Sequence, residues 1–235
     1  MSIFSVGIMQ GRLFPKYLDQ LQVFPINTWQ EEFDMAKKIG FEHIELLWDS
    51  KKEIKSATGL TEFVIDTSKL PTLSMCVDSI CRYILLEDIL SEILDVIDTF
   101  KSNTPLILVI PLLGKAEIKT INRLKELIIK LNNNELINLL KKYKIKLALE
   151  LDMPAKSIIE ALKVDNHECI GICIDSGNLW YYSSNPINDI YLLSAKIIHV
   201  HLKDKDKKGN NVLLGKGMVN FVEFCNVLKN INYSG

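Results

Sequence analysis

Two histidines and a lysine fall at every second position of the stretch KIIHVHLKD, residues Lys196–Asp204. Successive side chains of a β-strand point to opposite faces of the sheet, so this spacing predicts a strand with one polar and one apolar face. The inward face would hold His199, His201 and Lys203, and the face toward a helix layer would hold Ile198, Val200 and Leu202. Imidazole nitrogens gathered on one face can bind a metal ion or transfer protons.

Two carboxylates lie on the same polar face of the two preceding predicted strands. Glu150 lies in KLALELD, and Asp175 ends CIGICID. Taken alone, an aspartate before Ser-Gly-Asn is usually a turn residue, and an inward histidine is usually only hydrogen-bonded. Three such groups at matching depth on consecutive strands would be costly to bury without compensation. Glu150, Asp175 and His201 therefore predict one shared divalent cation, for which oxygen and nitrogen ligands favour Mn²⁺, Zn²⁺, Co²⁺ or Mg²⁺.

Further polar residues follow the early predicted strands and should reach the same rim. They are Gln10, Arg12, Glu45 and Asp78. A guanidinium at this rim could grip a phosphate or carboxylate with two parallel hydrogen bonds. Gln10 and Arg12 could equally well only cap the strand that they follow, so a substrate-binding role and a capping role both stay open.

The elements that must position these residues alternate regularly along the chain. Expected strands are Ile3–Met9, Glu42–Trp48, Thr72–Asp78, Leu106–Pro111, Ile145–Glu150, Cys169–Asp175 and Lys196–Leu202. Expected helices are Trp29–Ile39, Leu85–Phe100, Ile118–Lys142 with a break at its asparagine run, Pro154–Leu162, Pro186–Ser194 and Val219–Leu228. The first helix would begin with a capping box of Thr28 and Glu31. Asp49–Leu70 reads as a long loop near the substrate.

Strands that alternate with helices indicate a parallel α/β fold. The turn after the first strand, QGRLFP, lacks the glycine pattern of a dinucleotide-binding sheet. Several strands instead alternate large apolar residues with small or polar ones, which suits a TIM barrel whose interior is crowded. No linker-like composition interrupts the series, so residues 1–235 are expected to form a single barrel domain.

Composition narrows the class of protein. The chain has 235 residues, 48% hydrophobic residues and a formal net charge of −1, which gives no electrostatic case for nucleic acid or anionic membrane as a partner. Five cysteines without a CxxC pattern suit a reducing cytoplasm. No signal peptide and no membrane-spanning run is expected. The expected partner is a small molecule, and a homo-oligomer stays possible.

The motifs GIMQGRLFP, WQEEF…A…IGFEHIELL, LALELD, CIDSGN, HVHLKD and LLGKGMVNF together resemble the xylose isomerase-like TIM barrel family. The resemblance extends over essentially the whole chain and is greatest for the sugar-phosphate isomerase/epimerase branch. It implies that Glu150, Asp175 and His201 are three of four ligands to one divalent cation, with Glu150 also the catalytic base. His199 would lie deeper and support the site without binding the ion. Asn178 and Lys203 would contact substrate, although relatives often have histidine at the position of Asn178.

The resemblance also implies an eighth strand that ends in a fourth ligand, a glutamate that serves as the second acid/base. Only seven strands are expected before the final NYSG. We therefore expect a barrel that is open or truncated between Ile3–Met9 and Lys196–Leu202, with weakened metal binding and low or lost two-base activity. Asp204 and Asp206 are poor substitutes because they follow the seventh strand.

Three functions remain open at this point. The first is a metal-dependent isomerase or epimerase of a small sugar or sugar phosphate, which removes a proton from the carbon next to a carbonyl. The second is an inosose-type dehydratase, and the third is a non-catalytic sugar-binding relative, so enzymatic activity itself stays open. An endonuclease of the same superfamily is disfavoured because such enzymes bind several metals with many histidines, whereas this chain has four.

Overall fold

The computed structural model describes residues 4–15, 22–49, 70–100, 105–165 and 167–235. Most of the expected loop Asp49–Leu70 lies outside the described residues. Among the described residues, no helix is both long and apolar enough to cross a membrane.

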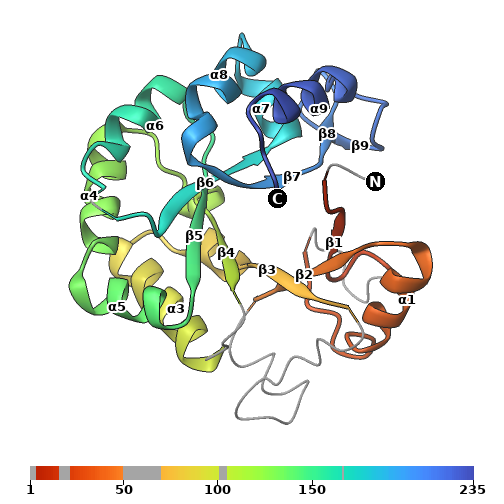
Figure 1. Cartoon of the computed structure of the whole chain (residues 1–235), viewed down its shortest axis with the longest axis horizontal. Helices are drawn as coiled ribbons and strands as arrows, with labels where there is room; N and C mark the ends of the chain where they lie inside the picture. Colours follow the sequence, from red (N-terminus) through yellow and green to blue (C-terminus); the bar gives the residue numbers. More distant parts are fainter. Residues whose placement is uncertain (1–3, 16–21, 50–69, 101–104, 166) are drawn as a thin grey trace.

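Seven parallel strands form one curled sheet in the order of the sequence (Figure 1). They are β1 (Gly7–Met9), β2 (His43–Leu47), β3 (Thr72–Cys76), β4 (Leu106–Pro111), β5 (Ile145–Glu150), β6 (Ile170–Asp175) and β7 (Ile197–His201). A short antiparallel hairpin, β8 (Asp204–Lys205) and β9 (Asn211–Val212), follows β7. All seven expected strands are thus present, with some shorter than expected.

Helices cover the outside of the curl (Figure 1). They are α1 (Glu31–Ile39), α3 (Leu86–Thr99), α4 (Ile121–Leu131), α5 (Asn134–Lys142), α6 (Ala155–Leu162), α7 (Ser176–Tyr182), α8 (Pro186–Leu193) and α9 (Phe221–Asn230). Short 3₁₀ turns span Asp78–Arg82, Gly114–Ala116 and Ser194–Lys196. The expected break in the long helical stretch is confirmed, because Asn133 caps α5 by accepting hydrogen bonds from the amides of Glu135 and Leu136.

One local expectation was wrong. The capping box is absent because α1 begins at Glu31, after Gln30, whose side chain makes no cap hydrogen bond. A different cap is present at Asp175, whose side chain accepts a hydrogen bond from the amide of Asn178 at the start of α7. A carboxylate at this position satisfies a backbone amide that has no partner within the helix. The cap fixes Asp175 at the carboxyl end of β6.

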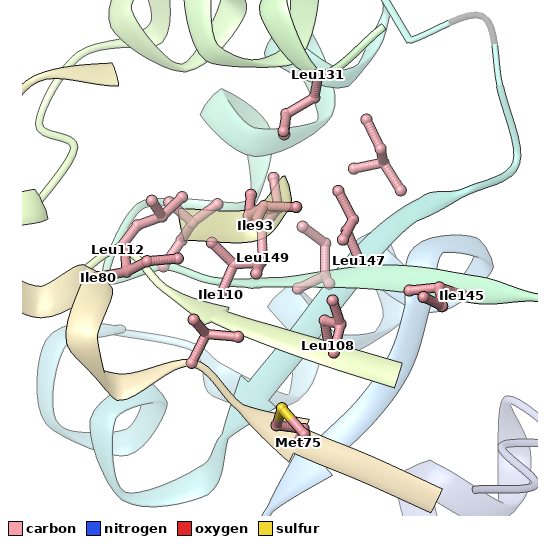
Figure 2. Close-up of a cluster of buried hydrophobic side chains, with 14 of the residues drawn as sticks. Met75, Ile80, Ile93, Leu108, Ile110, Leu112, Leu131, Ile145, Leu147 and Leu149 are labelled. Carbon is pink, nitrogen blue, oxygen red and sulfur yellow. The ribbon is translucent and has the colours of Figure 1, made fainter. Parts of the chain in front are cut away.

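The main core lies between the sheet and the helices. Figure 2 shows the outward leucines of β5, Leu147 and Leu149, gathered with Leu108 of β4, Met75 of β3 and Ile93 of α3. The alternation of apolar and polar residues along these strands is confirmed, because the apolar set belongs to this core. Helix α3 contributes the face that its periodicity predicts, namely Leu86, Ile89, Ile93, Val96 and Ile97, all buried.

A second, smaller apolar cluster fills the interior of the curl. It consists of Leu47, Cys76, Val109, Ala148 and Cys173, with Met9, Ile107 and Ile198 packed against it. Ile198 was expected to face the helices, and this expectation was wrong. The register between β6 and β7 shifts at this point, pairing Ile172 with Ile197 but Cys173 with His199. The extra residue turns the Ile198 side chain inward, over Gly171.

The curl stays open between its first and last strands. Within the described residues β7 pairs only with β6 and β1 only with β2, which confirms the open barrel. Figure 1 shows the C-terminus between these two strands. There the Tyr233 ring lies 6.2 Å from the Phe4 ring, centroid to centroid. Aromatic packing therefore occupies part of the opening.

We predict that Gly171→Ala lowers the free energy of unfolding by about 1–3 kcal/mol, because the interior has no space for another methyl group. A Cβ at this position would lie 2.7–2.8 Å from three side-chain carbons of Ile198. Thermal or urea unfolding of Gly171→Ala, Ile198→Ala and the double variant measures the coupling. The double variant should cost less than the sum of the single ones; strict additivity would contradict the inward placement of Ile198.

Candidate active site

Both histidines of β7 face a single carboxylate on β2. His201 Nε2 lies 2.9 Å from Glu45 Oε1, and His199 Nε2 lies 2.8 Å from Glu45 Oε2. The His201 contact has hydrogen-bond geometry, whereas Glu45 Oε2 has no hydrogen-bond partner. Glu45 is only 4% exposed. The inward placement of both histidines is therefore confirmed, and β7 contacts β2 across the interior of the curl.

The other ring nitrogen of His201 points to the opposite side. Its Nδ1 lies 3.7 Å from Glu150 Oε2, which is too long for a hydrogen bond. This separation is close to that of two atoms bound to one cation at about 2.1 Å each. Glu150, His201 and the thiol of Cys173 form one of two groups among the described residues that could hold a metal ion, and Glu45, His199 and His201 form the other.

Asp175 belongs to neither group, although it lies beside them. It lines a small cavity together with Glu150, Asn178 and Tyr182. Its Oδ2 is 3.5 Å from Lys203 Nζ, and the same Nζ donates to Asn178 Oδ1 at 3.3 Å. The structure thus brings Asp175, Asn178 and Lys203 together at the rim. A cation shared by Glu150, Asp175 and His201 stays a prediction, as does the role of His199 as a residue that does not bind the ion.

The strand register explains why the predicted ligands lie at different depths along the barrel interior. Asp175 pairs with His201, as equal depth requires, but Glu150 pairs with Cys173, one inward position deeper. Strands in a barrel are staggered relative to one another, so residues at the ends of neighbouring strands need not lie at one level. The long side chain of Glu150 still places its carboxylate near His201 Nδ1.

The two interior glutamates have opposite electrostatic surroundings. Burial alone would raise the pKa of Glu45, but the charges of His201 and His199 outweigh it and hold this pKa well below its usual range. Burial raises the pKa of Glu150 to about 7; His201 opposes this increase and Asp175 adds to it. Carboxylates whose pKa values diverge in this way can take different chemical roles.

The early strands supply a separate part of the rim. Gln10 is 1% exposed, accepts a hydrogen bond from the Leu47 amide at 3.2 Å, and has an Nε2 without a hydrogen-bond partner. The turn that follows is held by buried Glu32, whose carboxylate accepts hydrogen bonds from the amides of Gly11 and Leu13. This anchor, which the sequence did not reveal, positions exposed Arg12.

Asp78 begins the 3₁₀ turn after β3. Burial and the neighbouring Asp49 raise the pKa of Asp78, while Arg82 and Arg12 act in the opposite direction. The proximity of Arg12 and Asp78 links the rim after β1 to that after β3. Substrate contacts by Gln10, Arg12, Asp78, Asn178 and Lys203 stay predictions, and so does a substrate contact by Glu45, whose oxygens both lie within 3 Å of imidazole nitrogens.

Two side chains near the site were not predicted. Cys173 faces inward from β6, and burial raises the pKa of its thiol to about 12, although the neighbouring His201 acts in the opposite direction. Tyr233 comes from the C-terminal segment, where no strand or helix pattern places it. Burial, then the sulfur of Cys173, raise the pKa of Tyr233, and the charges of His201 and Glu45 also act on it. Only the folded chain brings this phenol near the histidines.

Residues 123–235 match the family model for the xylose isomerase-like TIM barrel. This segment contains Glu150, Asp175 and both histidines of β7. Solved structures of this fold also superpose on essentially the whole chain, as described below. Over residues 123–235 the chain is similar to the xylose isomerase-like TIM barrel family. The resemblance seen in its motifs is therefore confirmed.

Individual similar proteins share only a low sequence identity with this chain. The chain is 28% identical over 243 residues to the Haemophilus influenzae protein named "Putative L-ribulose-5-phosphate 3-epimerase SgbU", covering 88% of this chain and 82% of that protein. The 3-keto-D-glucoside 4-epimerase YcjR from E. coli has a TM-score of 0.65 at 16% identity, over 99% of this chain and 89% of that one. IolI, solved with a bound zinc atom, has a TM-score of 0.63 at 18% identity, over 88% and 81%.

The raised pKa of Glu150 has a consequence for stability. Between its ordinary pKa of 4.5 and about 7, folded Glu150 keeps a proton that the unfolded chain releases, so stability falls as pH rises. For metal-stripped protein we predict a loss of about 3 kcal/mol from this group between pH 4.5 and 8. Thermal unfolding across this range measures the loss.

The variant Glu150→Gln should lack this loss of stability with rising pH. The variant Glu31→Gln, at an exposed glutamate, serves as control. A Glu150→Gln protein with the wild-type pH dependence would contradict the burial cost assigned to this carboxylate.

Proposed function

We propose that this protein is a divalent-metal-dependent isomerase or epimerase of a small sugar or sugar phosphate. The observation that carries the proposal is the position of Glu150, whose carboxylate lines the rim cavity with Asp175 and lies 3.7 Å from His201 Nδ1. Similarity at 28% identity to the protein named "Putative L-ribulose-5-phosphate 3-epimerase SgbU" supports the substrate class. The zinc of IolI, a neighbour in fold, supports a metal in this type of site.

Glu150, Asp175 and His201 would hold one Mn²⁺, Zn²⁺, Co²⁺ or Mg²⁺ ion. Their oxygen and nitrogen atoms suit these ions, and the unbonded spacing of Glu150 and His201 leaves room for one. When bound, such an ion polarises the substrate carbonyl and stabilises the negative oxygen that forms after proton removal.

The chain's own residues would do the remaining work. Glu150 accepts the proton from the carbon next to the carbonyl, as a carboxylate held within reach of that carbon can do. The unpartnered Nε2 of Gln10 is a buried donor for a substrate hydroxyl. Arg12 can bind a substrate phosphate with two hydrogen bonds, and Lys203 with Asn178 orients the hydroxyls near Asp175.

The decisive experiment follows hydrogen exchange in D₂O. Metal-loaded protein is incubated with a panel of ketoses and ketose phosphates, and NMR measures deuterium at the carbon next to the carbonyl. We expect exchange with at least one substrate and a loss of at least ~100-fold in Glu150→Gln, because general-base catalysis is worth about 10²–10⁴-fold. No exchange with any substrate by the fully metal-loaded protein would overturn the proposal.

The same experiment separates the remaining alternatives. Net epimerisation requires a second acid/base, whereas exchange without epimerisation indicates Glu150 acting alone. A dehydratase instead eliminates water after the same proton transfer, so its product loses the mass of one water molecule. Binding of a sugar without exchange or elimination would indicate the non-catalytic relative.

Metal retention can be tested independently of activity. We predict that Asp175→Asn loses affinity for Mn²⁺ or Zn²⁺ by about 10-fold or more, since a carboxylate ligand becomes neutral. The helix cap should survive because asparagine also caps helices. Asp152→Asn is the matched control, as this exposed carboxylate lines the same cavity outside the predicted ligand set. Metal analysis after dialysis measures both; full retention by Asp175→Asn would remove Asp175 from the ligand set.

A further inference from the structure

The imidazole of His201 lies between two buried carboxylates, one at each ring nitrogen. Nε2 is 2.9 Å from Glu45 Oε1 in hydrogen-bond geometry, and Nδ1 is 3.7 Å from Glu150 Oε2 without a hydrogen bond. The contacts come from β2 on one side and β5 on the other. One ring nitrogen is therefore engaged by Glu45, and the other faces Glu150 on the side of the predicted cation; the Cys173 thiol also lies close to the ring.

The chemistry of a carboxylate determines which nitrogen carries the proton. Ionised Glu45 has only acceptor atoms, so the short contact requires a hydrogen on His201 Nε2. A neutral ring has one N–H, which leaves the lone pair on Nδ1, toward Glu150. Histidines that bind metals generally donate their other N–H to a carboxylate or carbonyl, which fixes the orientation of the ring and the nitrogen that binds.

The surroundings of Glu45 favour a fixed role over contact with a passing substrate. Its side chain is 6% exposed, and the two histidine rings against it are nearly perpendicular, at 85°. A buried carboxylate is costly unless it is paired, and both of its oxygens lie within 3 Å of an imidazole nitrogen. Moving Glu45 toward a substrate would break contacts that compensate its burial.

We propose that Glu45 is a positioning residue that accepts the Nε2–H of His201 and thereby holds Nδ1 toward Glu150 and the cation. The inference rests on the proposed function, because the cation is part of that proposal. Glu45 acts through His201 and does not need to touch substrate. His199 lies against the second oxygen of Glu45 and limits its movement.

The test begins with metal-free protein labelled with ¹⁵N-histidine. NMR should detect an Nε2–H of His201 that is shifted downfield and protected from exchange with water, whether the ring is neutral or charged. A His199→Gln variant distinguishes the signals of the two histidines. We expect the His201 signal to persist in Glu45→Gln, which keeps an acceptor oxygen, and to disappear in Glu45→Leu.

The second part measures affinity for Mn²⁺ and Zn²⁺ in the same proteins. Removing a residue that orients a metal ligand typically costs about 10–100-fold in affinity, which we expect for Glu45→Leu, with a smaller loss in Glu45→Gln. Glu92→Gln is the matched control. Glu92 is also a partly buried carboxylate, but it accepts its hydrogen bonds from Trp48, Ser79 and Tyr83 and not from a histidine. It should retain both the signal and the affinity.

The outcomes are distinguishable. A His201 signal that is absent in the wild type, or unchanged in Glu45→Leu, overturns this inference alone. Unchanged affinity in folded Glu45→Gln and Glu45→Leu also overturns it, because the ring would then bind without orientation by Glu45. A wild-type protein that has the hydrogen bond but binds neither ion overturns the proposed function, and with it the positioning role.

Discussion

The contact between Glu45 and His201 joins parts of the chain that are 156 residues apart. Glu45 lies on β2, the second strand of an open sheet, and His201 on β7, the last; within the described residues the first and last strands do not pair. Glu45 is buried and the side chain of His201 is 16% exposed, so separating them would leave the Glu45 carboxylate without one of its two imidazole partners. The contact therefore bridges the interior of the curl where the first and last strands do not pair.

His201 lies between two carboxylates whose pKa values are shifted in opposite directions. On the Nε2 side, Glu45 has its pKa held low by the two histidines and stays ionised. On the Nδ1 side, burial raises the pKa of Glu150 to about 7, which leaves it able to gain or lose a proton near neutral pH. One histidine thus stands between a carboxylate suited to a structural role and one suited to chemistry.

The sequence predicted the features that depend on periodicity. Cys76, Ala148 and Cys173 face inward because side chains alternate along regular strands, and α3 buries the face that its spacing indicates. Prediction was wrong for Ile198 because a register shift adds one residue, and alternation cannot reveal such a shift. The depth of Glu150 relative to Asp175 depends on strand stagger, which is a property of the assembled sheet.

Contacts between site residues that are far apart in the sequence were the least predictable part of the site. Glu45 was recognised as a polar rim residue, but its pairing with both histidines follows from how far the sheet curls, as does the approach of Tyr233. Glu32 resembled any acidic residue in the first turn of a helix, although it anchors the turn after β1. Local patterns identified which residues are polar and inward but not which of them meet.

The position of a bound metal relative to His201 tests this account most directly. Anomalous diffraction from crystals loaded with Mn²⁺ or Zn²⁺ would locate the ion. We predict a single peak about 2.1 Å from His201 Nδ1, on the side of Glu150, with Glu45 still against Nε2. A peak at Nε2, between Glu45 and His199, would contradict it.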